Sequence, residues 1–193
     1  NTFDWHPAEK HLRTGCGTLL ISAHLGSYEL LLPLWAQKHP VTVLYKPSKI
    51  PLLQKLIESS RTCSNLKILP ATRHGIRQLI KDLMNGGTAG LLVDHLPPKG
   101  SGVYADFFNK PAYTTTLPQQ LQLKTGCRIL AVGLERTENG VGYKLHIIER
   151  STPLSSVRAI AVREINFLIE ELILRMPTQY LWGYNRYKEP IRK

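Results

Sequence analysis

A histidine and a glutamate stand five residues apart inside an otherwise apolar run that covers residues 19–32. A packed interior segment requires neither His24 nor Glu29, so both side chains need a functional explanation. An imidazole that a carboxylate orients is a general base, which removes the proton from a hydroxyl group. The oxygen of that hydroxyl can then attack a thioester directly, without a Ser or Cys nucleophile on the enzyme. The pair is therefore predicted to be catalytic, with His24 as the base and Glu29 as its orienting partner.

The surrounding sequence explains how these two side chains would meet. The pattern predicts a strand that ends at Ala23 and a helix that begins near Ser27, with Gly26 permitting a tight turn between them. His24 and Glu29 would then face each other beside the free N–H groups of the helix N-terminus, which can hold an oxyanion. A histidine at a strand end also occurs in purely structural roles, and the helix dipole favours a glutamate in any first turn. The spacing alone leaves this structural interpretation open.

Strand-like and helix-like segments alternate along the rest of the chain. Such alternation predicts an α/β domain of three layers, α/β/α, with a mostly parallel central sheet. The Asn139-Gly140 pair favours a tight turn between the last two strands, which would form an antiparallel hairpin at the edge of the sheet. Residues 95–116 are expected to form a long loop, a candidate lid or ligand wall. The predicted strands cover residues 18–23, 41–45, 66–69, 88–93, 128–135 and 143–149, and the predicted helices cover residues 28–38, 51–60, 75–85, 117–124 and 156–175.

The composition indicates a single globular domain, spanning residues 1–193, with a strongly basic balance. Hydrophobic residues make up 42% of the chain, and 25 Lys and Arg residues stand against 14 acidic ones, which gives a formal net charge of +11. This charge favours an anionic partner such as a nucleic acid, a phospholipid surface or an acidic carrier protein. No apolar stretch reaches the length of a membrane-spanning helix, so the chain is expected to lie on a membrane rather than cross it. Because the sequence begins with Asn1, a membrane anchor is expected upstream.

The cysteines and the remaining histidines show no metal-binding spacing. The cysteines lack a CxxC pattern and are expected to be reduced thiols in a protein that faces the cytosol. No metal and no cofactor are therefore predicted. The cysteines are Cys16, Cys63 and Cys127, and these histidines are His6, His11, His39, His74, His95 and His146.

Two other classes of function agree with parts of the sequence. A basic nucleic-acid-binding module would account for the charge and for the aromatic residues near the C-terminus. Against it, no recognised binding motif is present and the basic residues are scattered, so nucleic acid is not the expected partner. A hydrolase would use Cys16 or Ser22 together with His24, but neither lies in a G-x-S-x-G nucleophile elbow.

Six short blocks of the sequence match, in order, the motifs of one enzyme family. They are His24-Leu25-Gly26-Ser27-Tyr28-Glu29, Tyr45-Lys46-Pro47, residues 75–87, Val93-Asp94-His95, Phe107-Phe108-Asn109-Lys110-Pro111-Ala112 and residues 179–188. The family that they resemble is that of the bacterial lipid A late acyltransferases, within the lysophospholipid acyltransferase superfamily. The departures leave His24 and Glu29 untouched, whereas Lys46 replaces a family arginine and gives up a bidentate contact with phosphate.

This resemblance implies transfer of a fatty acyl chain from acyl carrier protein to a hydroxyl group of a lipid A precursor, without a cofactor. A simpler lysophospholipid or another lipid is the alternative acceptor. The resemblance also implies the α/β/α fold of the glycerol-phosphate acyltransferases and a location at the cytoplasmic face of the bacterial inner membrane. The aromatic and basic residues of the tail, 182–193, would lie among the headgroups of an anionic membrane surface or pack on the domain.

Further residues become candidates for substrate binding in this family setting. Lys46 and Arg77 would hold phosphate groups of the glycolipid, although Arg77 fits equally well on a solvated helix face. Asp94, at the end of a buried strand, would order the basic site or bind a sugar hydroxyl, or else cap backbone N–H groups. Phe107 and Phe108 would line an acyl channel or hold their loop to the domain.

Overall fold

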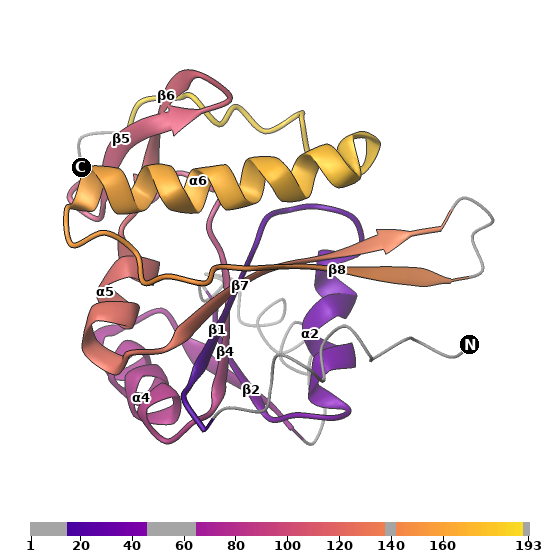
Figure 1. Cartoon of the computed structure of the whole chain (residues 1–193), viewed down its shortest axis with the longest axis vertical. Helices are drawn as coiled ribbons and strands as arrows, with labels where there is room; N and C mark the ends of the chain where they lie inside the picture. Colours follow the sequence, from indigo (N-terminus) through magenta and orange to yellow (C-terminus); the bar gives the residue numbers. More distant parts are fainter. Residues whose placement is uncertain (1–14, 46–64, 138–141, 191–193) are drawn as a thin grey trace, which may run out of the picture.

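A central sheet of six strands organises the protein, for which the computed structural model describes residues 15–45, 65–137 and 142–190. The strand order is β3-β2-β4-β1-β7-β8, and every neighbouring pair is parallel except β7 and β8 (Figure 1). The predicted mostly parallel sheet with an antiparallel edge is therefore confirmed. The strands are β1 (Thr18–Ser22), β2 (Val41–Tyr45), β3 (Leu66–Pro70), β4 (Thr88–Leu92), β7 (Arg128–Arg136) and β8 (Tyr143–Glu149).

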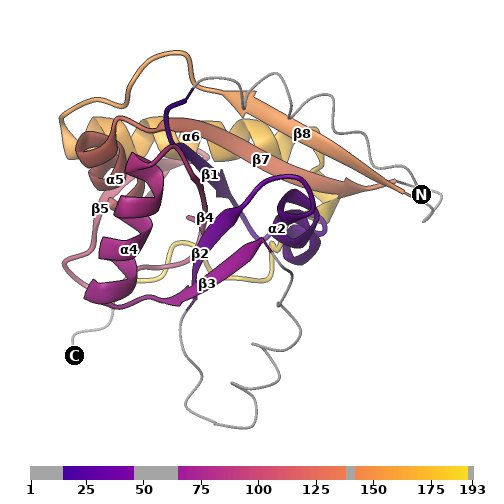
Figure 2. The same cartoon turned by 90° about the horizontal axis from the view of Figure 1, so that it is seen from below.

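Helices cover both faces of this sheet (Figures 1 and 2). Helix α2 (Tyr28–Ala36) lies on one face, and α4 (Arg73–Met84), α5 (Leu117–Thr125) and α6 (Arg158–Arg175) lie on the other. A short 3-10 turn, η1 (Pro177–Gln179), follows α6. The three-layer arrangement is the one that the alternation predicts.

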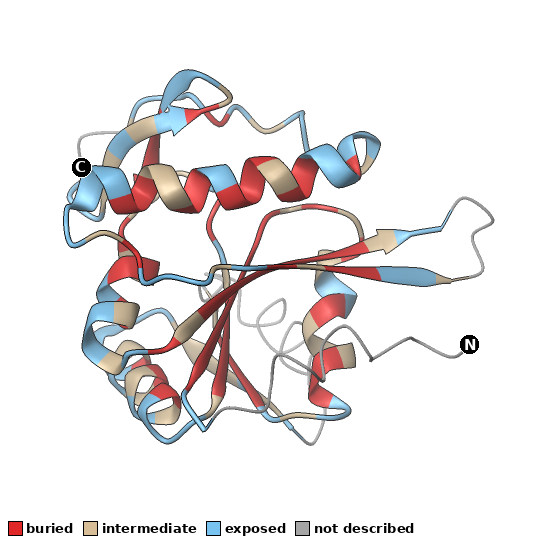
Figure 3. Ribbon diagram, viewed as in Figure 1, coloured by how far each residue is buried: buried red, intermediate tan, exposed pale blue. Residues whose placement is uncertain are grey.

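Strand β1 runs through the middle of the core and is buried along its whole length (Figure 3). Leu19 and Ile21 pack into the cluster beneath α4, α5 and α6, whereas Leu20 packs with Leu31 and Trp35 of α2. A parallel strand with both faces covered reads as a continuous apolar run rather than as an alternating one, which explains the sequence pattern. Both ends of β1 are thereby fixed in the interior.

The prediction of a long loop over residues 95–116 was wrong. This segment contains a second, two-stranded sheet, formed by β5 (Gly102–Phe107) and β6 (Lys110–Thr115), which packs against α6 (Figure 1). Its two-residue turn places Phe108 and Asn109 at φ values of 48° and 58°. Such a turn usually carries glycine, and a Phe-Asn pair does not signal a hairpin. The hairpin is tied down by Asn166, whose amide group donates to the carbonyl oxygens of two β5 residues.

Other helix and strand boundaries differ from the expected ones by a few residues. Helix α4 begins at Arg73 rather than Gly75, because Thr72 is its N-cap and accepts a hydrogen bond from the Gly75 N–H. The predicted helix over residues 51–60 and the Asn139-Gly140 turn lie outside the described residues. Among the helices described, none is long and apolar enough to cross a membrane.

Candidate active site

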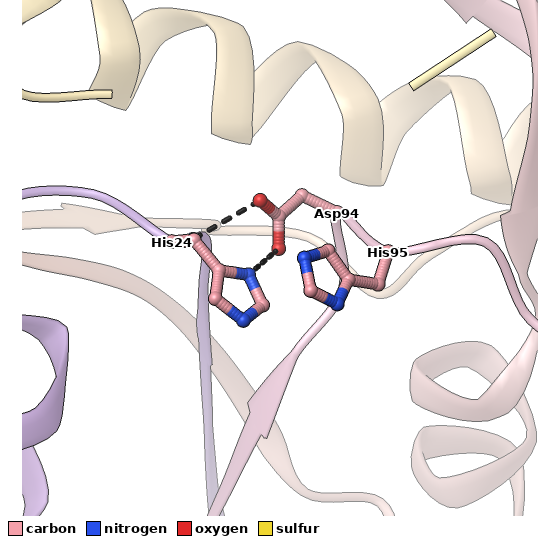
Figure 4. A group of neighbouring side chains, drawn as sticks. All are labelled: His24, Asp94 and His95. Carbon is pink, nitrogen blue, oxygen red and sulfur yellow. Dashed lines mark hydrogen bonds and ion pairs between the residues drawn. The ribbon is translucent and has the colours of Figure 1, made fainter. Parts of the chain in front are cut away.

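The parallel pairing of β1 with β4 brings His24 and Asp94 together. The register aligns Ser22 with Leu92, and each of the two polar residues lies two positions beyond its strand. Asp94 accepts a hydrogen bond from the backbone N–H of His24 at 3.0 Å, and its other oxygen lies 2.9 Å from His24 Nδ1 (Figure 4). The carboxyl ends of parallel strands are where α/β sheets bind their ligands, so this pair is placed for chemistry.

The carboxylate fixes the protonation pattern of the imidazole. Asp94 is only 3% exposed. Burial alone would raise the pKa of Asp94, but the hydrogen bonds and the charge of His24 hold it below its ordinary value. An ionised carboxylate can only accept hydrogen bonds, so Nδ1 of His24 must carry the proton. In the neutral imidazole Nε2 is therefore the nitrogen with the lone pair, which is the form that a general base requires.

Tyr180 adds a neutral polar group beside Asp94. Burial, followed by the neighbouring charge and hydrogen bond of Asp94, raises the pKa of the Tyr180 hydroxyl. The phenol therefore stays protonated at neutral pH and can donate to the carboxylate. This contact also helps to keep Asp94 ionised, because it stabilises the charged form.

The backbone around His24 is held from two sides. The N–H of Ser27 donates to the carbonyl oxygen of Leu134 in β7 at 2.8 Å, and the N–H of Leu181 donates to the carbonyl oxygen of His24 at 3.0 Å. Between them, Gly26 has φ +60°, and a Cβ atom there would lie 2.1 Å from the oxygen of Leu134. Only glycine fits this position, and the tight turn predicted around it is present.

Aromatic rings enclose the imidazole of His24. The ring of His95 stacks on it with centroids 3.7 Å apart and an angle of 9° between the planes, and Tyr184 stacks on the far side of His95 at 4.2 Å. Tyr28 meets His24 edge-on at 4.8 Å. Burial, and then the charge of His24, lower the pKa of His95, which favours its neutral form. These contacts restrict rotation of the His24 ring.

The same cluster offers three potential metal ligands. One ligand atom each of His24, Asp94 and His95 lies within 4.8 Å of the others. A metal ion binds an imidazole nitrogen in the plane of the ring, and two nearly parallel rings 3.7 Å apart do not direct their lone pairs to one point. In addition, Nδ1 of His24 is already bonded to Asp94. The geometry therefore favours a hydrogen-bonded pair, and the absence of a metal stays a prediction.

An apolar cavity of about 110 Å³ lies between α2 and the sheet. Tyr28 lines it and also contacts the ring of His24, so the cavity adjoins the pair. Gly90 of β4 forms part of its wall, where the missing side chain leaves room beside Leu32 and Val43. The walls are mostly aliphatic, as in sites that hold hydrocarbon.

The structure gives His24 a different carboxylate partner from the one that the spacing predicted. Glu29 lies on the exposed first turn of α2 and lines the cavity, and within the described residues no hydrogen bond joins it to His24. The reason is that the β1–β4 register supplies Asp94 directly opposite His24. The signal in the sequence is a polar residue at the end of each of two strands. This signal indicates a pair only once the strands are known to be neighbours. A role for Glu29 in the reaction stays a prediction.

Among the other predicted residues, Asp94 meets His24, whereas Arg77 and Phe107 make no hydrogen bond or ion pair with this pair in the described residues. Arg77 is exposed on α4, and in the part of the chain that the structure describes it makes no hydrogen bond or ion pair with the cluster. Lys46 lies outside the described residues. Phe107 is 2% exposed in the core and meets the ring of Phe108 at 4.9 Å. Their roles in substrate binding stay predictions.

Comparison with known proteins identifies the family. The family "Bacterial lipid A biosynthesis acyltransferase" matches residues 3–189. The chain belongs to this family. The family resemblance predicted from the six sequence blocks is thereby confirmed. His24 and Asp94 are the imidazole and the carboxylate that the fold of this family member brings together at the end of its sheet.

Individual relatives carry related names. The chain is 30% identical to a lipid A biosynthesis acyltransferase of Haemophilus influenzae over 176 residues and 29% identical to a lipid A biosynthesis lauroyltransferase of Escherichia coli over 175 residues. It is 25% identical to a lipid A biosynthesis palmitoleoyltransferase of Escherichia coli over 173 residues. Each alignment covers 89% of this chain and 56% of the relative. The chain thus spans about half the length of these relatives.

Proposed function

We propose that this protein transfers a fatty acyl chain from acyl carrier protein to a hydroxyl group of a lipid A precursor, with His24 as the general base. The observation that carries the proposal is the hydrogen bond between His24 Nδ1 and the buried carboxylate of Asp94, beside an apolar cavity. Membership of the lipid A acyltransferase family supports the class of reaction. The names of the relatives support a lipid A precursor as the acceptor.

The reaction requires one proton to move from the acceptor to the departing thiol. Nε2 of His24 takes the proton of the acceptor hydroxyl as the oxygen bonds to the carbonyl carbon of the thioester. The C–S bond then breaks, and the imidazolium returns the proton to the thiolate, leaving an ester and a free thiol. Asp94 holds the ring through Nδ1 and stabilises its transient positive charge. His24 therefore acts as base and then as acid within one turnover.

The cavity beneath α2 is the proposed place for the acyl chain. Its aliphatic walls match a hydrocarbon, and Tyr28 links it to the imidazole. A chain that enters past Tyr28 would leave its thioester near Nε2 of His24. In this arrangement Glu29, which also lines the cavity, would lie near the thioester end of the acyl chain rather than orient the base.

The surface around His24 suits an anionic membrane. Four exposed apolar side chains belong to segments that adjoin the pair, and the formal net charge of +11 complements anionic headgroups. We place the protein at the cytoplasmic face of the bacterial inner membrane, where Lys46 and Arg77 would contact phosphate groups. The four side chains are Leu30, Leu92, Leu181 and Trp182.

Acyl transfer by the purified protein tests this function. The assay supplies acyl carrier proteins loaded with a mixture of chain lengths, together with a lipid A precursor or a lysophospholipid, and mass spectrometry identifies the products. We expect an acylated lipid A precursor from the native protein and a loss of nearly all turnover in His24→Ala, with an unchanged circular dichroism spectrum. Full activity of His24→Ala would overturn the proposal. Release of free fatty acid alone would indicate a hydrolase, and acylation of the lysophospholipid alone would replace the acceptor.

A further inference from the structure

Arg186 is a buried cation without a carboxylate partner. Its side chain is among the most enclosed in the segment that follows η1, with only 3% of the residue exposed. One terminal nitrogen donates to the carbonyl oxygen of Tyr113 at 2.9 Å, and the other donates to the hydroxyl of Thr114. The guanidinium also lies 5.3 Å from the ring centre of Phe107. None of these partners is charged, and among the described residues Arg186 forms no ion pair.

The guanidinium also retains an unused donor. Nε of Arg186 is buried and has no hydrogen-bond partner. Burial lowers the pKa of Arg186, yet an arginine side chain keeps its charge at neutral pH. A buried positive charge without a compensating anion is costly, and a buried donor without an acceptor adds to that cost. Both deficits would be removed by one anionic group beside Arg186.

A cavity of about 200 Å³ adjoins this side chain. A single water molecule needs only about 10–15 Å³ of such space, so a phosphate group fits. Arg186 lines the cavity together with Tyr180 and Tyr184, and the charged group of Lys188 lies 4.4 Å above the ring of Tyr184. Arg186 is thus the cation among the lining side chains, which are otherwise mainly aromatic, and Lys188 adds a second positive charge on the ring of Tyr184.

The cavity is joined to the proposed catalytic pair. Tyr180 reaches Asp94, and Tyr184 stacks on His95, which stacks in turn on His24. The only carboxylate in this group is that of Asp94, and both of its oxygens are bonded to His24. The charge of Asp94 raises the pKa of Arg186 through space, but among the described residues Asp94 makes no hydrogen bond with the guanidinium, so the Nε donor stays unpaired.

We propose that Arg186 forms an anion-binding site in this cavity, which takes a phosphate group of one of the two substrates. The phosphate would come from the phosphodiester that links pantetheine to the acyl carrier protein or from the headgroup of the glycolipid acceptor. Naming these two sources rests on the proposed function, whereas the binding of phosphate itself does not. A phosphate bound there would hold its substrate close to His24, the residue that removes the proton.

The first test measures phosphate binding without any acyl transfer. The melting temperature is recorded in inorganic phosphate and in chloride of equal ionic strength for the native protein, Arg186→Gln and Arg186→Lys. The control is Arg175→Gln, because Arg175 is a partly exposed arginine on α6 that is paired with Glu171. We expect phosphate to raise the melting temperature of the native protein and the control and to leave Arg186→Gln unchanged. An equal rise in Arg186→Gln would overturn the proposal.

The second test identifies the source of the phosphate. Arg186→Lys keeps the charge but loses the fork of donors, so the KM of one substrate should rise about 10- to 100-fold with a smaller change in kcat. A higher KM for the acyl donor assigns the pantetheine phosphodiester, and a higher KM for the acceptor assigns the headgroup. If the KM values for both substrates stay unchanged while the free energy of unfolding falls, Arg186 only stabilises the fold and the proposal is wrong. If the native protein shows no acyl transfer, the proposed function fails, and the phosphate-dependent melting still decides the role of Arg186.

Discussion

His24 and Asp94 are 70 residues apart in the sequence and occupy equivalent positions beyond two paired parallel strands. The two oxygens of Asp94 bond to the backbone N–H and to the ring of the same histidine. A carboxylate held by both contacts sets the position of the imidazole and its tautomer together. The geometry of the site is thus a direct consequence of strand register.

Gly26→Ala is expected to disturb the site through the backbone. The new methyl group would meet the carbonyl oxygen of Leu134 in a turn whose φ is +60°. Strain of this kind costs about 1–3 kcal/mol in the free energy of unfolding and would displace His24. Gly126→Ala is the matched control, because Gly126 has φ +67° but open space around it. Urea unfolding and acyl-transfer assays should show that both variants lose stability and that only Gly26→Ala loses most of its turnover; equal turnover in the two would contradict this.

Gly90→Ala is expected to shorten the preferred acyl chain. Its methyl group would press on the end of the Leu32 side chain at 2.8 Å and push it into the cavity beneath α2. Loss of space for one methylene changes selectivity by roughly tenfold or more, so kcat/KM should fall most for the longest chain accepted. Gly133→Ala is the control: its methyl group would press on Met176 at the same distance but on the opposite face of the sheet. An unchanged chain-length profile in Gly90→Ala would show that the acyl chain binds elsewhere.

In His95→Gln, the free energy of unfolding is expected to fall less in mild acid than it does in the native protein. The pKa of His95 is lowered from 6.5 by burial and by the charge of His24, so the unfolded chain binds a proton before the folded protein does. Stability therefore falls as the pH drops below about 6.5, and the contribution of His95 is fully present above that value. Urea unfolding of both proteins between about pH 7 and pH 5 measures the slope. A slope as steep in His95→Gln as in the native protein would mean that other groups cause it.

The sequence was sufficient to predict the central layers of the fold. β1 is buried along its whole length and β4 over its first three residues, and such strands are short apolar runs that stand out between helical segments. The hairpin of β5 and β6 was missed because its turn uses Phe108 and Asn109 at positive φ without a glycine. Turn geometry that tertiary contacts impose leaves little trace in local composition.

The candidate site was predictable only in part, for a similar reason. His24 was identified from its own surroundings, since an imidazole in an apolar strand end is conspicuous. Asp94 was a candidate from its place at the end of a buried strand, but that it meets His24 depends on which strands are neighbours, and a local pattern carries no such information. The tail shows the same limit: Trp182 is 58% exposed, whereas Arg186, four residues further on, is buried. A basic residue near the end of a chain gives no sign of burial in its sequence.

The measurement that tests the central claim most directly compares the turnover of Asp94→Asn with that of Glu29→Gln. An asparagine at position 94 can donate to Nδ1 and so reverse the tautomer of His24, while the size of the side chain is kept. We expect kcat to fall by about 10²–10⁴-fold in Asp94→Asn and to change only a few-fold in Glu29→Gln. Circular dichroism should show that both variants are folded. The opposite result, a severe loss in Glu29→Gln with near-native turnover in Asp94→Asn, would contradict the assignment of Asp94 as the residue that orients the base.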